Sequence, residues 1–174
     1  MSESLVPFEP RVALASLSGE SNADWARAGA REAGAAFLGG LSIDEPTREA
    51  ARELVDRDRS EFLPRDPLAF AESQLAPLAE APILPGMNVR ASTLEPLREI
   101  AAICVEHDAI CEINGHCRQA EMCRVGTGEH MLENQDRLLA QVSAASDQGA
   151  TVSVKVREKP TVDLAALARR IERA

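Results

Sequence analysis

A short stretch near the middle of the chain holds the residues best suited to chemistry. It reads I-C-E-I-N-G-H-C-R from Ile110 to Arg118. An apolar strand followed by Asn114-Gly115 predicts a sharp turn, because glycine allows backbone angles that other residues resist. Cys117 would then follow the C-terminal end of a strand, which is where α/β enzymes place their active sites.

Cys117 has neighbours that could make its thiol chemically useful. His116 is a possible base, and Arg118 adds a positive charge. A thiol in such surroundings can act as a nucleophile or, beside a flavin, as a proton donor. The alternative is a small buried apolar side chain, which is what most free cysteines are. The position alone leaves both interpretations open.

The four cysteines, Cys104, Cys111, Cys117 and Cys123, lie within 20 residues, and three histidines lie nearby. Zinc or an iron–sulfur cluster is therefore a candidate. However, the spacing C-x6-C-x5-C-x5-C matches neither zinc fingers nor ferredoxins, and Cys104 and Cys111 fall on predicted apolar faces. We predict free thiols and no metal site, with a metal-binding module as an alternative.

Two further features could bind an anion. Gly126-Thr127-Gly128 precedes a predicted helix, where free backbone amides can hold a phosphate, although glycines before helices are common. Lys155 and Arg157 lie on one face of a predicted strand, and Val154 and Val156 lie on the other. A lysine inside a barrel needs an anionic partner, because burying it alone is costly. The alternative is a solvated pair at the strand end.

These residues need a scaffold, and the chain alternates strand and helix patterns in five units of about 30 residues. Strict alternation predicts a parallel sheet covered by helices. Two architectures fit: a doubly wound sheet, or five units of a (β/α)8 barrel. The G-x-G-x-x-G fingerprint of dinucleotide-binding proteins is absent after the first strand. Strands are expected at 11–15, 35–38, 83–89, 109–113 and 151–156, and helices at 22–33, 44–59, 66–80, 93–107, 129–146 and from a cap at Thr161.

The composition limits the classes of function. A length of 174 residues suits a single domain, residues 1–174, and the net charge of -9 argues against general coating of nucleic acid. A local basic patch remains compatible with this charge. No apolar run approaches the ~20 residues of a membrane span, and no signal peptide is visible. We therefore expect a cytoplasmic protein with no membrane partner.

Together, these motifs resemble those of the dihydrouridine synthases, flavin-dependent tRNA-modifying enzymes built on a TIM barrel. The family's strand-four signature, I-N-x-G-C-P, is similar to the segment 113–118 in its Ile, Asn and Cys. The resemblance covers nearly the whole chain. The other matches are V-K-x-R of strand five at Val154–Arg157, A-P-M-x-G of strand one at Ala15–Gly19, a strand-three glutamine at Asn88, and a glycine pair with a leucine-rich helix start at Gly126–Leu132.

The resemblance implies an FMN-dependent oxidoreductase that reduces a uracil-type ring, above all uridine in tRNA, with NAD(P)H as the reductant. Cys117 would be the catalytic proton donor to the ring. The residues expected to bind FMN are Ala15, Ser16, Leu17, Asn88 and Lys155, and those expected to contact the substrate are Asn114, His116, Arg118 and Arg157.

The chain also departs from the family pattern. His116 and Arg118 replace the Gly and Pro that flank the cysteine, and Ser16-Leu17 replaces Pro-Met. An enzyme closer to dihydroorotate or dihydropyrimidine dehydrogenases, acting on a small pyrimidine, is therefore an alternative.

The match to units one to five predicts an incomplete barrel. Such a barrel should hold flavin weakly and self-associate through its open sheet edges. A non-catalytic half-barrel is a further alternative.

Overall fold

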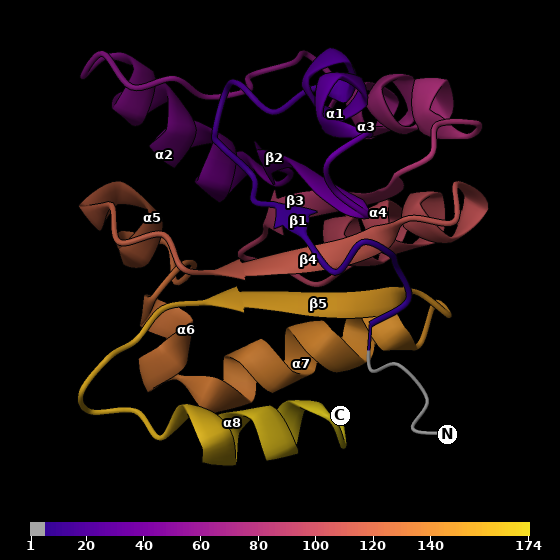
Figure 1. Cartoon of the computed structure of the whole chain (residues 1–174). Coiled ribbons are helices and arrows are strands. Elements are labelled where there is room, and N and C mark those ends of the chain that lie inside the picture. The colour runs from indigo at the N-terminus through magenta and orange to yellow at the C-terminus, as the bar shows by residue number, and fades with distance from the viewer. Residues whose placement is uncertain (1–5) are drawn as a thin grey trace.

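The computed structural model describes residues 6–174, and its centre is a curled sheet of five parallel strands (Figure 1). Each strand pairs with the next one in the chain, so the order is β1-β2-β3-β4-β5 without a reversal. A doubly wound sheet has a point where the strand order reverses, so that alternative does not apply. The strands are β1 (Ala13–Leu14), β2 (Ala35–Ser42), β3 (Leu84–Arg90), β4 (Ile110–Gly115) and β5 (Thr151–Val156).

Helices connect the strands and cover the outside of the half-barrel. In Figure 1, α1, α2 and α3 lie above the sheet, and α7 and α8 lie below it. The helices are α1 (Ala23–Gly29), α2 (Glu45–Val55), α3 (Pro67–Leu75), the 3-10 turn η1 (Ala76–Leu78), α4 (Glu95–Glu106), α5 (Ala120–Arg124), α6 (His130–Glu133), α7 (Gln135–Ser146) and α8 (Leu164–Ile171).

The two faces of the sheet differ in polarity because side chains alternate along each strand. Met87 and Cys111 point outward into the main core, together with residues of α1, α3 and α4. Ile113 packs in a second core cluster with α7 and α8. The concave face instead carries polar residues, including Asn88 and Glu112, which are joined by a hydrogen bond. A polar concave face provides groups that can contact a ligand.

Short polar side chains start the helices by accepting hydrogen bonds from free backbone amides. Asn22 accepts from the Trp25 amide, as its position before α1 predicts. Asp44 caps α2, and its other carboxylate oxygen accepts from the backbone and hydroxyl groups of Ser92 and Thr93. Burial raises the pKa of Asp44, but the hydrogen bonds from Thr47 and Ser92 outweigh it, and the pKa lies below its usual value. Asp44 therefore joins α2 to the loop after β3.

Two predicted strand ends are wrong. β2 continues through Gly39-Gly40 to Ser42, because these glycines serve a close strand contact: a Cβ at Gly39 would lie 2.4 Å from the Asn88 carbonyl oxygen. β4 continues to Gly115, since Asn114 and Gly115 are in register with β5. The turn follows the Asn-Gly pair.

Several helix boundaries and the first strand also differ from the predictions. The expected helix 129–146 is broken at Asn134, whose φ of -113° and ψ of 69° are not helical. Asp163, not Thr161, caps α8 by accepting from the Ala166 amide. The first strand has only two residues, and α1 and α2 end at Gly29 and Val55, several residues earlier than expected.

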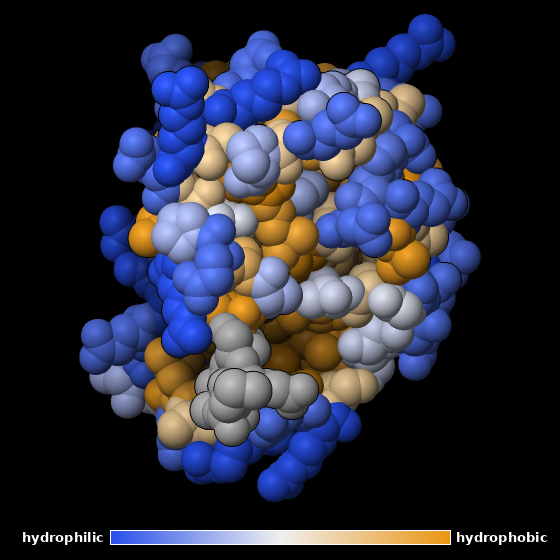
Figure 2. Space-filling model, turned by 45° about the vertical axis from the view of Figure 1, so that its right-hand side comes forward, coloured by the Kyte–Doolittle hydropathy of each residue, from blue (hydrophilic) through white to orange (hydrophobic). Residues whose placement is uncertain are grey.

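The surface is largely hydrophilic in the view of Figure 2, and hydrophobic residues show in a hollow between the hydrophilic ones. Leu17, next to the end of β1, is 50% exposed. Among the helices within residues 6–174, none combines the length and apolarity needed to cross a membrane.

Candidate functional site

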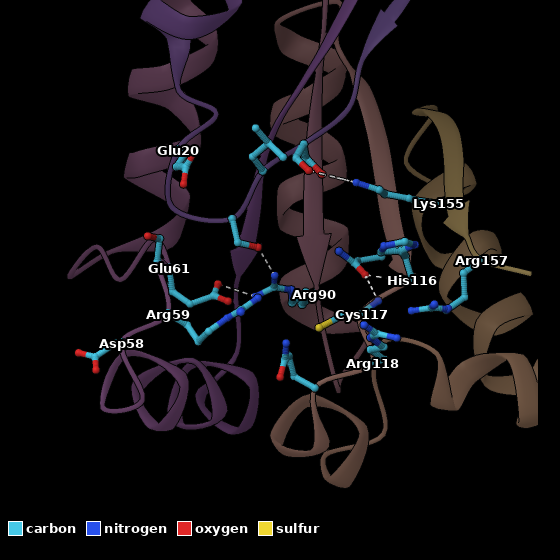
Figure 3. Close-up of a pocket in the computed structure, with 16 residues that line it drawn as sticks. Glu20, Asp58, Arg59, Glu61, Arg90, His116, Cys117, Arg118, Lys155 and Arg157 are labelled. Carbon is cyan, nitrogen blue, oxygen red and sulfur yellow. Dashed lines mark hydrogen bonds and ion pairs between the residues drawn. The ribbon is translucent and has the colours of Figure 1, made fainter.

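A pocket of about 750 Å³ opens at the C-terminal ends of the strands (Figure 3). Its walls come from the loop after β1, the segment 58–61, the end of β3, the loop after β4 and the end of β5. This volume is typical of small-molecule sites. Of the residues predicted to form the site, those lining the pocket are Ser16, Leu17, Asn114, His116, Cys117, Arg118, Lys155 and Arg157.

Two predicted site residues do not line the pocket. Ala15 is exposed to solvent just after β1. Asn88 is fully buried, and its amide is bonded to Glu112 and Asn114. Asn88 therefore supports a wall residue and is not itself open to a ligand in this structure.

The backbone around Cys117 is held from two sides. Asn114 Oδ1 accepts hydrogen bonds from the backbone amides of His116 at 3.1 Å and Cys117 at 3.0 Å. The Cys117 carbonyl oxygen accepts from the Glu129 amide at 2.8 Å. The half-buried thiol of Cys117 is therefore carried by a fixed turn at the pocket wall.

The segment from Gly126 to Gly128 supports this turn and does not form the predicted phosphate site. Gly128 has φ of +63°, and a Cβ there would lie 2.1 Å from the Cys117 carbonyl oxygen. The next amide, that of Glu129, is already bonded to Cys117. The helix that follows, α6, has only four residues. Gly128 therefore allows close packing against Cys117, whereas Gly126 lies against the guanidinium of Arg137.

Lys155 reaches from β5 to the loop after β1. Its Nζ donates to the backbone carbonyl and to the hydroxyl of Ser16, both at 3.1 Å. Within residues 6–174, it forms no ion pair with a carboxylate. The sequence predicted an anionic partner for this lysine; its hydrogen bonds go to two neutral oxygens, and the carboxyl on which its charge acts is that of Glu112, whose pKa it lowers. Its charge therefore remains available to a ligand.

A buried ion pair, which the sequence reasoning missed, forms another part of the wall. Arg90 Nη1 lies 2.6 Å from Glu61 Oε2, with side chains 3% and 5% exposed. Arg90 also donates to the Ser18 hydroxyl, and its Nε has no hydrogen-bond partner among residues 6–174. Burial raises the pKa of Glu61, although Arg90 opposes this rise. Arg90 could have been placed on the concave face from the sequence, because it lies two residues after Asn88 in the same strand. No local pattern indicates that Glu61 would meet it.

The pocket is rich in positive charge although the chain is acidic. In the described part of the chain, Arg59 and Arg118 form no ion pair, and both are exposed at the pocket. Arg157 Nε lies 3.6 Å from Glu129 Oε2. Burial lowers the pKa of His116, and the charges of Lys155, Arg157 and Arg118 lower it further. At neutral pH this favours a neutral imidazole among cations, in surroundings suited to an anionic group.

The cysteines do not come together as a metal site. Cys104 and Cys111 are buried, and their contact, together with burial, raises the pKa of Cys104. The Cys123 thiol donates to the Cys117 carbonyl at 3.7 Å. Over residues 6–174, no three His, Cys, Asp or Glu side chains are placed to hold a metal ion.

Comparison with known proteins gives one distant relative. An uncharacterized protein of Methanocaldococcus jannaschii is 25% identical over 157 residues, which cover 89% of this chain. The match spans 61% of that protein, so the chain corresponds to less than two thirds of its length. No family model matches the chain, and no solved structure matches it.

Proposed function

We propose that the pocket binds FMN and that the chain is part of a TIM-barrel oxidoreductase that reduces a uracil-type ring, with uridine in tRNA as the favoured substrate. The main support is that Cys117, Asn114 and Lys155, which carry the resemblance to dihydrouridine synthases, line one pocket. They come from two strands and the loop after one of them, all at the strand ends where barrel enzymes hold their sites.

The residues present fit a flavin. Among the described residues, Lys155 hydrogen-bonds to neutral oxygens of Ser16, so its ammonium can instead contact an electron-rich atom of the flavin ring. Arg59 and Arg118 offer unpaired guanidinium groups for a phosphate. When bound and reduced by NAD(P)H, FMN supplies the hydride.

Cys117 would complete the reduction as a general acid. Its Sγ–H bond breaks as the proton moves to the ring carbon next to the one that accepts the hydride, and the sulfur keeps the electron pair. Asn114 holds the turn that carries this thiol. His116 and Arg118 flank it in sequence, and they could bind an anionic group of the substrate.

Titration of the purified protein with FMN tests the proposal, with the visible absorbance of the flavin as the signal. We expect Lys155→Met to weaken binding about tenfold, equivalent to about 1.4 kcal/mol. Lys159→Met is the matched control, because Lys159 pairs with Glu133 and does not line the pocket. Failure of the wild-type protein to bind FMN would contradict the proposal.

Two alternatives make different predictions. If the enzyme resembles dihydroorotate or dihydropyrimidine dehydrogenases, the reduced flavin should be reoxidised by a free pyrimidine and not by tRNA. If the chain is a non-catalytic half-barrel, neither FMN nor pyrimidine should bind. The open edges at β1 and β5 favour this last reading, because they could pair with a partner.

A further inference from the structure

The concave face of the sheet holds a buried carboxylate that the proposed chemistry does not use. Glu112 lies in β4 two residues before Asn114, so both side chains point to the same face. It is 6% exposed and does not line the pocket. Its Oε1 accepts from Asn88 Nδ2 at 2.7 Å, and Ser153 Oγ donates to its Oε2 at 3.4 Å.

Hydrogen bonds in series connect Glu112 with the turn that carries Cys117. Asn88 donates to Glu112 through Nδ2 and accepts at Oδ1 from Asn114 Nδ2, at 2.8 Å. Asn114 in turn accepts at Oδ1 from the amides of His116 and Cys117. Asn88 is 0% and Asn114 5% exposed, so water competes little for these bonds.

The two ends of this series determine the orientation of both amides. Backbone N–H groups can only donate and an ionised carboxylate can only accept, whereas a side-chain amide can do either at its two ends. Turning Asn88 over would place its Oδ1 against a Glu112 oxygen and its Nδ2 against the Asn114 amino group. Both contacts would leave buried polar groups unpaired, which is unfavourable. Only one orientation satisfies every partner.

We propose that Glu112 is a positioning residue, whose carboxylate orients Asn88 and Asn114 and through them fixes the backbone of His116 and Cys117. The placement of the thiol thus depends on a group that no ligand in the pocket touches. This role in positioning does not depend on what the pocket binds. Its effect on turnover rests on the proposed function.

The charge of Glu112 matters to this role. The groups that act on it are Asn88 from β3 and Ser153 and Lys155 from β5, of which only Lys155 is charged. Burial raises the pKa of Glu112, and these three partners offset the rise only in part. A protonated Glu112 can donate as well as accept, so the series loses its fixed end. The turn at Cys117 should therefore loosen as the pH falls.

Hydrogen exchange of backbone amides, followed by NMR, tests the role directly. Glu112→Gln keeps the size of the side chain but replaces the carboxylate, which can only accept hydrogen bonds, by an amide that can also donate them. We expect the amides of His116 and Cys117 to exchange at least tenfold faster in this variant. Ser153→Ala is the matched control, because it removes another contact of Glu112 and leaves the series intact. Unchanged exchange across β5 would show that the fold is retained.

A pH titration of the wild-type protein provides a second test that needs no variant to fold. The Cys117 amide shift should follow the titration of the Glu112 carboxyl, measured on its own side-chain carbon. In Glu112→Gln, the pH dependence of the Cys117 amide shift should contain only the step caused by titration of His116. The proposal is overturned if the Cys117 amide shift of the wild-type protein does not follow the Glu112 titration. It is also overturned if the His116 and Cys117 amides exchange equally fast in the wild type and in the folded Glu112→Gln variant. Neither test uses flavin, so a failure of FMN binding would leave this result standing.

Discussion

Cys117 combines a half-buried thiol with a backbone held by Asn114 on one side and Glu129 on the other. Holding a proton donor in place matters because general acid catalysis depends on the distance over which the proton moves. This residue is therefore where the proposed reaction is most sensitive to a single change.

We expect Cys117→Ala to retain bound flavin but to lose about 10²–10⁴-fold in turnover, the usual contribution of a positioned general acid. Stopped-flow reoxidation of the reduced flavin by tRNA or by a free pyrimidine measures this. Cys123→Ala is the control, because Cys123 is also half-buried and contacts the same turn. Equal rates for Cys117→Ala and the wild type would show that Cys117 is structural.

At the scale of elements, the loop between α5 and α6 acts on the site by packing. Gly128 lies against the Cys117 carbonyl in a backbone conformation that favours glycine, with φ of +63°. Gly149, after α7, has a similar φ of +83°, but within residues 6–174 no non-neighbouring atom lies within 4 Å of the place where an added Cβ would stand. These two glycines separate the cost of backbone strain from the cost of a steric clash.

We expect Gly149→Ala to lower the free energy of unfolding by about 1 kcal/mol, the cost of the left-handed conformation. Gly128→Ala should cost about 1–3 kcal/mol more, because the new methyl group must displace the Cys117 turn. Urea denaturation measures both values, and alkylation of Cys117 reports the displacement. Equal losses in the two variants would mean that the turn moves freely.

Glycines near two of the strands show what the sequence could and could not predict. β5 was located correctly because T-V-S-V-K-V alternates clearly after Gly149. Gly39-Gly40 was read as a strand end, since glycine usually marks one, but here it allows close contact with β3. Close contacts of this kind depend on a distant segment, and local patterns carry no information about them.

The site shows the same division. The strand ends at Asn114 and Lys155 follow from local alternation, and the structure brings them to one pocket. Glu112 could have been found, because a carboxylate among apolar residues two positions before Asn114 is itself a signal. Glu61 could not, since it lies in an irregular segment and meets Arg90 only in the folded chain.

At the scale of the whole molecule, the sheet has two edges. β1 has two residues, whereas β5 has six and, within the part of the chain that the structure describes, pairs with β4 alone. A longer unpaired edge offers more free N–H and C=O groups for pairing. The β5 edge is therefore the stronger candidate for association with a second copy of the chain.

We expect the purified chain to show a mass above 18.7 kDa that rises with concentration in light scattering. Amide exchange should locate the contact: amides of Thr151–Val156 that exchange quickly in dilute solution should be protected in concentrated solution. Amides of β3, which is paired on both sides, should not change. A monomer at every concentration would show that the β5 edge is protected in another way.

The order of the strands also bears on how the chain folds. Each pairing joins neighbouring units, so the sheet can grow one unit at a time with little loop-closure entropy at each step.

The contact of Lys155 with Ser16 is different, because it joins residues 139 positions apart. It should form after the rate-limiting step, so Lys155→Met should speed unfolding and leave the refolding rate unchanged. Stopped-flow kinetics in urea would measure both rates, and slower refolding would place this contact in the folding nucleus.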